Sequence, residues 1–236
     1  MKIGGLQKLT LIDYPGQIAC TVFTAGCNFR CPFCHNPELV LPEKIKNDAT
    51  AETAGEKKFF DFLKERQGKL DGVCITGGEP TIQPDILEFI RAIKAMGFLV
   101  KLDTNGTNPQ VLTKVYQEKL VDFVAMDIKN SLENYEKACG NLLNKARIQE
   151  SVFLIRKSKV PYEFRTTVVP TIHTLDDFIA IGRWLKGARK YALQRYQDKG
   201  KILNATLRKE AKNGIIDLDE IKLTIQDCFG EIEIRG

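Results

Sequence analysis

Three of the seven cysteines fall within eight residues, with a spacing typical of a metal-binding loop. The segment Cys27-Asn28-Phe29-Arg30-Cys31-Pro32-Phe33-Cys34 reads C-x3-C-x2-C. Three thiolates on one short loop can hold a soft metal ion or an iron–sulfur cluster. A [4Fe–4S] cluster normally takes four cysteines, so three would leave one iron open to another ligand. The alternatives are a zinc ion with His35 as the fourth ligand, or three cysteines that bind nothing.

Polar or glycine-bearing segments follow the later apolar stretches of the chain. They are Gly77-Gly78-Glu79-Pro80, Asp103-Thr104-Asn105-Gly106, Asp127-Ile128-Lys129 and Val169-Pro170. Glycines let a ligand approach the backbone closely, and Glu79 and nearby carbonyls can accept hydrogen bonds from an ammonium group. Carboxylates such as Asp103 and Asp127 can accept ribose hydroxyl protons or hold a cation, and Lys129 can meet a carboxylate. The alternative for the double-glycine segment is a simple strand-to-helix turn.

Short apolar stretches alternate with stretches of helical period. We expect strands at Ile18–Thr24, Gly72–Thr76, Phe98–Thr104, Asp122–Ile128, Tyr162–Val169 and Tyr191–Arg195. We expect helices at Glu56–Arg66, Asp85–Met96, Gln110–Lys119, Lys145–Lys157 and Leu175–Leu185, then a last helix near Leu218–Asp227 and a strand at Glu231–Arg235. This alternation predicts βαβ units and a parallel sheet.

Six such units predict an α/β fold with fewer strands than a complete eight-fold barrel. The sheet is therefore expected to be a partial barrel or doubly wound, and in both cases ligands bind at the carboxyl ends of the strands. The polar segments should then outline one cavity mouth. No repeat or linker composition divides the chain, so we expect one domain over residues 1–236, with a core of about 18–196 and a C-terminal extension of about 197–236.

Composition excludes several classes of protein. The chain has 236 residues, of which 43% are hydrophobic, and no segment approaches the ~20 apolar residues that span a bilayer. The start, MKIGGLQKLTLIDYPG, has no continuous apolar stretch, so we expect no secretion signal and a cytoplasmic protein. An odd number of cysteines in a reducing compartment argues against a disulfide framework. With only His35 and His173, hydrolytic chemistry has little support.

Charge is unevenly distributed along the chain. The formal net charge of +5 is too small to predict a nucleic-acid partner. The region Arg183–Asn213, however, holds ten basic and two acidic residues. It could meet an acidic partner, although solvated Lys and Arg side chains on helix faces are the simpler interpretation.

The cysteine loop and the double-glycine segment together resemble the radical S-adenosylmethionine (SAM) enzymes. The shared features are the C-x3-C-x2-C spacing, an aromatic Phe33 before the third cysteine, and GGEP beginning 43 residues after Cys34. The resemblance implies a partial (β/α)6 TIM-like barrel and one [4Fe–4S] cluster on Cys27, Cys31 and Cys34. It also implies that the open iron chelates the amino and carboxylate groups of SAM.

A narrower resemblance is to the activating enzymes of glycyl radical enzymes, in particular the anaerobic ribonucleoside-triphosphate reductase activating proteins. It rests on Cys34–Pro37, Leu102–Gly106, Met126–Lys129 and Leu6–Gly16. It implies that one electron from the cluster cleaves SAM to methionine and a 5′-deoxyadenosyl radical, which removes an α-hydrogen from a glycine of a partner enzyme. A low-potential electron donor such as flavodoxin or ferredoxin would be a second partner.

The resemblance also assigns SAM-binding roles to the loop residues. Gly77, Gly78 and Glu79 would hold the SAM amino group, mainly through backbone carbonyls. Phe33, with the backbone of His35, would pack against adenine. On this interpretation Gly78→Ala should leave the cluster in place and weaken SAM binding.

Further roles fall on the next two strand ends. The resemblance implies that Asp103, Thr104 and Asp127 contribute to a monovalent cation site beside SAM. Lys129 would lie near the SAM ribose or carboxylate. Asn105 completes the set of SAM-binding candidates, although the simpler interpretation of Asn105 and the glycine after it is a turn.

The sequence departs from the pyruvate formate-lyase activases before the first predicted strand. Those enzymes carry D-G-P-G-x-R in a loop that approaches the partner's peptide, where this chain reads DYPGQI at Asp13–Ile18. The partner therefore stays open. Two other functions also stay open: a radical SAM enzyme acting on a small molecule or RNA, and a non-enzymatic iron–sulfur or zinc-binding regulatory module.

Overall fold

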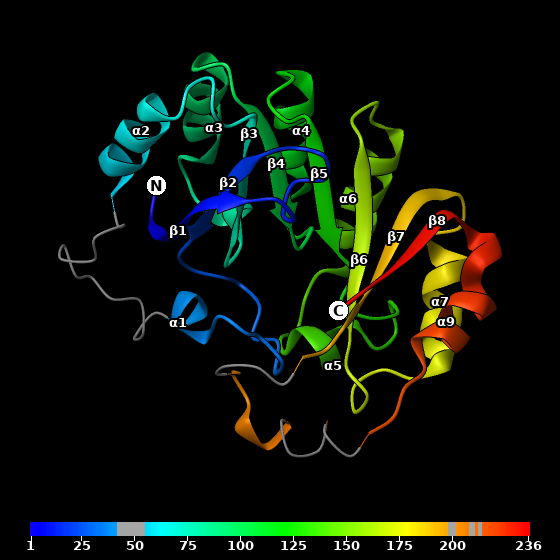
Figure 1. Ribbon diagram of the computed structural model, residues 1–236. Helices are drawn as coiled ribbons and strands as arrows, with labels where there is room; N and C mark the ends of the chain where they lie inside the picture. Colours follow the sequence, from blue (N-terminus) through cyan, green and yellow to red (C-terminus); the bar gives the residue numbers. More distant parts are fainter. Residues whose placement is uncertain (42–54, 198–201, 208–210, 212–213) are drawn as a thin grey trace. The chain divides into compact units, whose positions relative to one another are not determined.

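The strands β1 to β8 follow one another in the sheet in the same order as in the sequence (Figure 1). The structure is a computed structural model that describes residues 1–41, 55–197, 202–207, 211 and 214–236. Its internal contacts divide the chain into two compact units. The first unit comprises residues 1–28, 38–125 and 146–161, and the second comprises residues 29–37, 126–145 and 162–236.

The first unit holds one end of the sheet. Its strand β1 (Ile3–Thr10) is antiparallel to β2 (Ala19–Thr24). Strands β3 (Gly72–Gly77) and β4 (Leu99–Thr104) then run parallel to β2. The residues of β2 and β3 are nearly all buried, as expected for parallel strands covered on both faces. The carboxyl ends of β2, β3 and β4 consequently lie at the same edge of the sheet.

The helices of this unit bury the apolar stripes that their sequences predict. They are α1 (Pro37–Val40), which enters the unit at residue 38, α2 (Glu56–Glu65), η1 (Pro80–Ile82), α3 (Ile86–Ala95), α4 (Pro109–Gln117) and α6 (Lys145–Lys157), which enters it at residue 146. On α3, Ile86, Phe89, Ile90 and Ile93 recur at helical spacing and are buried. The Phe89 ring stacks on Phe59 of α2 with ring centroids 5.1 Å apart.

The second unit holds the other end of the sheet, and β5 (Phe123–Asp127) ends in it. Its remaining strands are parallel: β6 (Tyr162–Val168), β7 (Ala188–Arg195) and β8 (Phe229–Arg235). Its helices are α5 (Tyr135–Cys139), α7 (Leu175–Trp184), α9 (Leu218–Ile225) and the short η2 (Gln226–Cys228). Helices α7 and α9 lie side by side (Figure 1). Gly182 permits this packing, because a Cβ there would lie 3.3 Å from the Ile225 side chain.

Each strand and helix predicted from the sequence is present, with small shifts at the ends. The main difference is β1, which the sequence did not predict as a strand. Its residues IGGLQKLT carry little apolar signal, and only Ile3 and Thr10 are buried. β1 is antiparallel and mostly exposed, so neither a buried apolar run nor a clean alternation marks it. The single-domain assignment stays a prediction.

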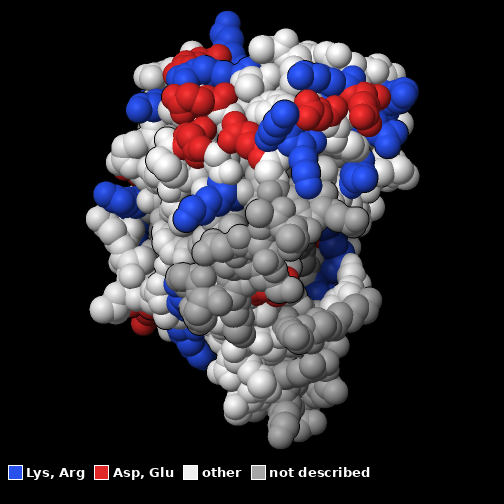
Figure 2. Space-filling view, turned by 90° about the vertical axis from the view of Figure 1, so that its left-hand side faces the viewer, with Lys and Arg blue, Asp and Glu red and all other residues white. Residues whose placement is uncertain are grey.

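Charges of both signs are mixed on the part of the surface seen from the side of α2. Figure 2 shows Lys and Arg atoms interspersed with Asp and Glu atoms among the described residues of that face. On α3, Arg91 pairs with Glu88 at 3.1 Å and, beyond that helix, with Glu118 at 2.7 Å. The basic region Arg183–Asn213 lies partly outside the described residues; within it, Lys190 pairs with two glutamates of β8. Among the described helices, none is long and apolar enough to cross a membrane.

A buried ion pair across the second unit provides a test of the fold. The carboxylate of Glu163 on β6 is 1% exposed and accepts two hydrogen bonds, at 3.0 and 2.7 Å, from the guanidinium of Arg235 on β8. We expect Arg235→Met to lower the free energy of unfolding by about 3 kcal/mol, because it leaves a buried carboxylate without this cation. Equilibrium unfolding in urea measures the loss. The double variant Glu163→Gln/Arg235→Met should recover most of it, and a double variant no more stable than the single one would contradict the account.

Candidate functional site

The double-glycine loop holds the chain just before the first cysteine. Gly78 donates its backbone N–H to the Thr24 carbonyl at 2.9 Å, and Glu79 donates to the Gly26 carbonyl at 2.8 Å. Gly77 has a φ of +113°, a conformation that favours glycine. A Cβ on Gly78 would lie 1.9 Å from the Gly26 oxygen and 3.3 Å from the Cys27 nitrogen. The close approach of the two loops therefore requires glycine at position 78.

The Glu79 carboxylate joins the loop after β3 to the loop after β4. It is 1% exposed. One oxygen accepts hydrogen bonds from the Thr81 N–H at 3.1 Å, the Thr81 hydroxyl at 2.5 Å and the Thr104 hydroxyl at 2.7 Å. The other accepts the Asn105 N–H at 2.6 Å. Burial raises the pKa of Glu79, and these hydrogen bonds offset part of the rise because they favour the carboxylate. The Glu79 side chain thus fixes the two loops, which differs from the expectation that it faces a ligand.

Asn28 connects the cysteine loop to the same region. The Asn105 amide donates to the Asn28 side-chain oxygen at 2.8 Å, and the Asn28 amide donates to the Thr107 hydroxyl at 2.8 Å. Asn105 in turn accepts the Thr107 hydroxyl proton at 2.7 Å. The sequence analysis did not single out Asn28; its position directly after Cys27, inside the C-x3-C segment, was the available signal. In the first unit, three strand-end loops therefore converge next to Cys27.

Asp103 is also engaged within the first unit. Its carboxylate contacts the ammonium of Lys101, two residues earlier on the same face of β4. Both side chains are buried, with 2% of Lys101 and 10% of Asp103 exposed. Lys101 was not predicted as a site residue, because a lysine in a predicted strand is ordinarily taken as solvent-exposed.

The rest of the cysteine loop lies in the second unit and is fixed by segments distant in sequence. Asn204 donates its N–H to the Pro32 carbonyl at 2.9 Å, and Leu203 donates to the Cys34 carbonyl at 3.2 Å. Arg30 donates to the Cys139 carbonyl at 2.8 Å. Next to that contact, a Cβ on Gly140 would lie 2.2 Å from the Arg30 oxygen, and Gly140 has a φ of +73°. These contacts set the loop's conformation through its backbone.

Two cations flank the Asp127 carboxylate at the end of β5. Lys129 Nζ lies 2.9 Å from one oxygen and Arg165 Nε lies 2.5 Å from the other. Burial opposes ionisation of Asp127, but the charges of Arg165 and Lys129 outweigh it and hold the Asp127 pKa below its ordinary value. Burial likewise opposes the charge on Lys129, but Asp127 and the nearby Cys31 thiol raise the Lys129 pKa. Lys129 thus pairs with Asp127 of its own unit, and its role toward a ligand stays a prediction; Arg165 is a partner of Asp127 that was not predicted from the sequence.

His173 fixes the backbone beside Lys129. The ring accepts the Val169 N–H on Nδ1 at 3.0 Å, so its other nitrogen donates to the Lys129 carbonyl at 2.8 Å. Burial lowers the pKa of His173. The Phe33 ring packs edge-on against His173 with centroids 6.5 Å apart. His35 stacks on Tyr196 at 5.5 Å. The predicted aromatic residues therefore border the carboxyl ends of β6 and β7.

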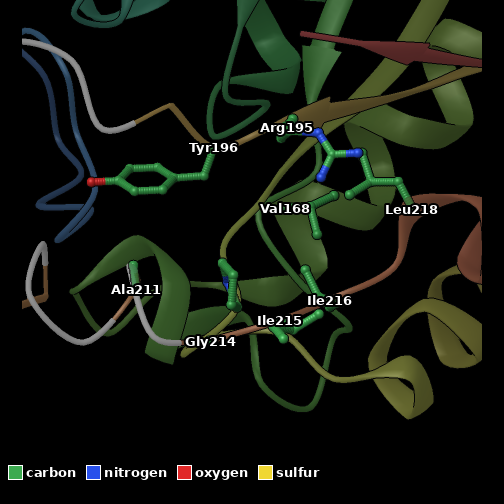
Figure 3. Close-up of a pocket in the computed structure, with 9 residues that line it drawn as sticks. Val168, Arg195, Tyr196, Ala211, Gly214, Ile215, Ile216 and Leu218 are labelled. Atoms are coloured by element: carbon green, nitrogen blue, oxygen red, sulfur yellow. The ribbon is translucent and has the colours of Figure 1, made fainter.

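A cavity of about 300 Å³ opens at the ends of β6 and β7 (Figure 3). Its walls are mostly apolar, and Figure 3 shows Val168, Ile216 and Leu218 on one side with Arg195 beside them. Tyr196 extends to the opposite side. Of the strand-end residues that were predicted to outline one cavity mouth, Pro170 lines this cavity. Arg195 and Tyr196 were not assigned a role from the sequence.

The donor set suits an iron–sulfur cluster. Cys27 and Cys34 are partly exposed, whereas Cys31 is buried. The Lys129 ammonium close to Cys31 is the kind of neighbour that favours a thiolate ligand. Within the described ranges, no three His, Cys, Asp or Glu side chains are gathered into a preformed metal site. The assignment of Cys27, Cys31 and Cys34 as ligands stays a prediction.

The description of one protein family matches most of the chain. Residues 21–185 match the radical SAM superfamily. This span contains the cysteine loop, the double-glycine loop and the strand ends that carry Asp103 and Asp127.

Two relatives have similar sequences over most of their length. MJ1227 of Methanocaldococcus jannaschii, described as a glycyl-radical enzyme activating enzyme, is 36% identical over 203 residues, which is 84% of this chain and 80% of that protein. A pyruvate formate-lyase-activating enzyme of Streptococcus mutans is 33% identical over 220 residues, covering 85% and 81% of the two chains.

A solved structure shows the same fold. SuiB from Streptococcus suis, crystallised with S-adenosylmethionine, aligns with a TM-score of 0.64 at 13% identity. The alignment covers 89% of this chain and 48% of SuiB, so this chain spans about half the length of that protein. This likeness and the family match confirm the partial barrel and set aside the doubly wound sheet.

The contact between the double-glycine loop and the segment before Cys27 predicts that Gly78→Ala disturbs the cysteine loop. From the sequence, this variant was expected to keep its cluster and to weaken SAM binding. The new methyl group would overlap the Gly26 carbonyl and press on the Cys27 backbone, so the cysteine loop must move. We expect the free energy of unfolding to fall by about 2–3 kcal/mol and the iron content after anaerobic reconstitution to fall with it. Gly55→Ala is the matched control, since a Cβ there has nothing within 4 Å. Wild-type iron content and stability in Gly78→Ala would contradict this account.

The Asp127 ion pairs predict a pH-dependent stability. In the folded protein the pKa of Asp127 lies below its ordinary value of 3.8. The stabilisation from its ion pairs is therefore fully present above pH 3.8, and it is lost as the pH falls toward the pKa of Asp127 in the folded protein. Asp127→Asn should therefore cost about 2 kcal/mol at pH 7, and the difference from wild type should shrink in acid. Urea unfolding between pH 7 and pH 3 measures this. Asp61→Asn, an exposed carboxylate on α2, should change stability little at either pH, and a constant Asp127→Asn deficit would contradict the prediction.

Proposed function

Because the chain belongs to the radical SAM superfamily and within it to the glycyl-radical enzyme activating enzymes, we propose that it generates a glycyl radical on an anaerobic ribonucleoside-triphosphate reductase. The enzyme class and the use of a [4Fe–4S] cluster and SAM follow from family membership. That membership sets aside the zinc-binding or regulatory module. The observation that carries the proposal for this chain is the fixed contact of the double-glycine loop with the backbone next to Cys27.

The cluster would be held by Cys27, Cys31 and Cys34. When bound, it supplies the electron that cleaves SAM to methionine and a 5′-deoxyadenosyl radical. The chain's own contribution is to fix the cysteine backbone from both sides. Gly26 is held by the double-glycine loop before Cys27, and residues 203–204 hold the loop at its other end. These main-chain contacts hold the two ends of the loop, from which the three thiolates would bind the cluster.

SAM would bind at the carboxyl ends of the strands. We propose that carbonyls of Gly77 and Gly78 accept the SAM ammonium protons, while Glu79 holds their loop in place as a positioning residue. Phe33 and the His35 backbone would line the adenine site. Because Glu79 satisfies Thr81 and the loop after β4, its own carboxylate contributes by orientation and not by contact.

The charged end of SAM would meet the residues after β4 and β5. Lys129 stays ionised, because its pKa is raised beside Asp127. It is thus suited to the SAM carboxylate or ribose oxygens. The Asn105 amide, oriented by Asn28 and Thr107, is a further polar contact for the nucleoside.

The partner would be a macromolecule that covers the region before β2. Leu9, Leu11, Ile12 and Ile18 are exposed by 57, 68, 86 and 46%. Exposed apolar side chains that gather in one segment are typical of a protein interaction surface. The same segment, Leu6–Gly16, carries the resemblance to activating proteins of anaerobic ribonucleoside-triphosphate reductases. A flavodoxin or ferredoxin would supply electrons, and the protein would act in the cytoplasm.

Anaerobic assays test the class and the partner separately. Reconstituted protein with SAM and dithionite should form 5′-deoxyadenosine. Addition of an anaerobic ribonucleoside-triphosphate reductase from the same cell should give a doublet glycyl signal by electron paramagnetic resonance. Cys31→Ser should abolish both results by removing a ligand, whereas Cys228→Ser, a cysteine outside the loop, should retain them.

The outcomes discriminate between functions. 5′-Deoxyadenosine without a glycyl signal would reject the reductase as partner and favour a radical SAM enzyme acting on a small molecule or RNA. Iron-loaded protein that forms no 5′-deoxyadenosine would reject the proposed reaction itself.

A further inference from the structure

Lys101 is a buried lysine whose charge is matched inside the first unit. Its ammonium contacts the Asp103 carboxylate and lies 3.7 Å from the Cys74 sulfur and 5.9 Å from the centroid of the Phe123 ring. Only 2% of its side chain is exposed. Water is therefore replaced around the ammonium by a carboxylate, a soft sulfur and the face of an aromatic ring, all of which favour a cation.

The position of this ammonium does not fit the predicted monovalent cation site. Asp103, Thr104 and Asp127 were the expected oxygen ligands of a free cation. Each of them is already engaged within its own unit. Asp103 contacts Lys101, the Thr104 hydroxyl donates to Glu79 and accepts the N–H of residue 106, and Asp127 pairs with a lysine and an arginine. The residues present thus supply protein cations where a free ion was expected.

We propose that the Lys101 ammonium is the resident cation of the Asp103 site, so that this chain binds SAM without a free monovalent cation. The inference rests on the proposed function, because it takes the end of β4 to border the SAM site. Lys101 is then a positioning residue: it contacts the Asp103 carboxylate at the end of β4, directly before Thr104 and Asn105, the residues that meet the Glu79 loop.

A tethered ammonium suits this role for physical reasons. A primary ammonium is a compact monovalent charge that donates three hydrogen bonds. Because it is covalently attached, it costs no translational entropy of ion binding and its occupancy does not depend on the salt present. Stability alone does not account for a buried pair of this kind, since apolar residues of the same volume are often equally stabilising.

Two substitutions at position 101 separate a cation role from a purely structural one. Lys101→Ser removes the ammonium and opens space next to Asp103 that potassium can fill, with a hydroxyl as an added ligand. Lys101→Met removes the charge but keeps the length of the side chain, so its apolar end blocks the same space. Both are compared with wild type in potassium chloride and in N-methyl-D-glucamine chloride at equal ionic strength, because the bulky organic cation cannot enter the site.

The first readout is the thermal stability of the cluster-free protein, which does not depend on activity. Lys101→Ser should melt about 3 °C higher in the potassium salt than in the organic salt. Wild type and Lys101→Met should show no such difference. In the double variant Lys101→Ser/Asp103→Asn the potassium effect should vanish, because the carboxylate that holds the ion is gone.

The second readout is SAM affinity of the reconstituted protein. Wild type should bind equally in both salts, and Lys101→Ser should lose about tenfold in the organic salt and recover most of it in potassium, a typical coupling between two bound ligands. Lys101→Met should lose affinity in both salts. A wild-type protein that requires potassium, or a Lys101→Ser variant indifferent to it in both readouts, would overturn the inference. Wild type that binds no SAM in either salt would instead reject the proposed function, while the melting experiment still decides the role of Lys101.

Discussion

The close approach of two backbones, where Gly78 meets Gly26, is the constraint on which the arrangement of the first unit depends. No side chain fits between them, and the Gly78 and Glu79 N–H groups bind the segment that precedes Cys27. The first cysteine is thereby placed relative to the strand ends by main-chain hydrogen bonds. Such bonds tolerate less adjustment than contacts between flexible side chains. The Glu79 carboxylate extends the same arrangement to the loop after β4.

Charge within the two units is organised around single carboxylates with protein cations beside them. Asp103 contacts Lys101 in the first unit, and Asp127 contacts Lys129 and Arg165 in the second. The charges of Arg165 and Lys129 hold the pKa of Asp127 below its ordinary value, although burial opposes its ionisation. In the second unit, His173 also holds the backbone of Lys129, because its ring donates a hydrogen bond to the Lys129 carbonyl.

The sequence predicted the parts of the molecule that carry strong local signals. Buried runs such as Ile18–Thr24 and the helical spacing of Ile86, Phe89, Ile90 and Ile93 correspond to β2 and α3, and the cysteine spacing indicated the family. β1 escaped prediction because its residues are mostly exposed. Lys101 escaped because a lysine within a strand is ordinarily taken as solvent-exposed, and Arg165 escaped because it pairs with Asp127, which is distant in the sequence. The Glu79 carboxylate was expected to face a ligand, and only the positions of its four donors reveal that it holds two loops together.

The hydrogen bonds from Leu203 and Asn204 to the cysteine loop have a bearing on how the protein matures. During synthesis the cysteines emerge about 170 residues before these donors, and amino-terminal segments fold first. The nascent loop thus leaves the ribosome with the carbonyls of Pro32 and Cys34 still hydrated. Proteins that deliver iron and sulfide during synthesis would meet the cysteine loop before these two hydrogen bonds form. Proteins that act after release from the ribosome would meet the loop with both bonds formed. The backbone around Pro32 and Cys34 therefore completes these hydrogen bonds only after Leu203 and Asn204 have been synthesised.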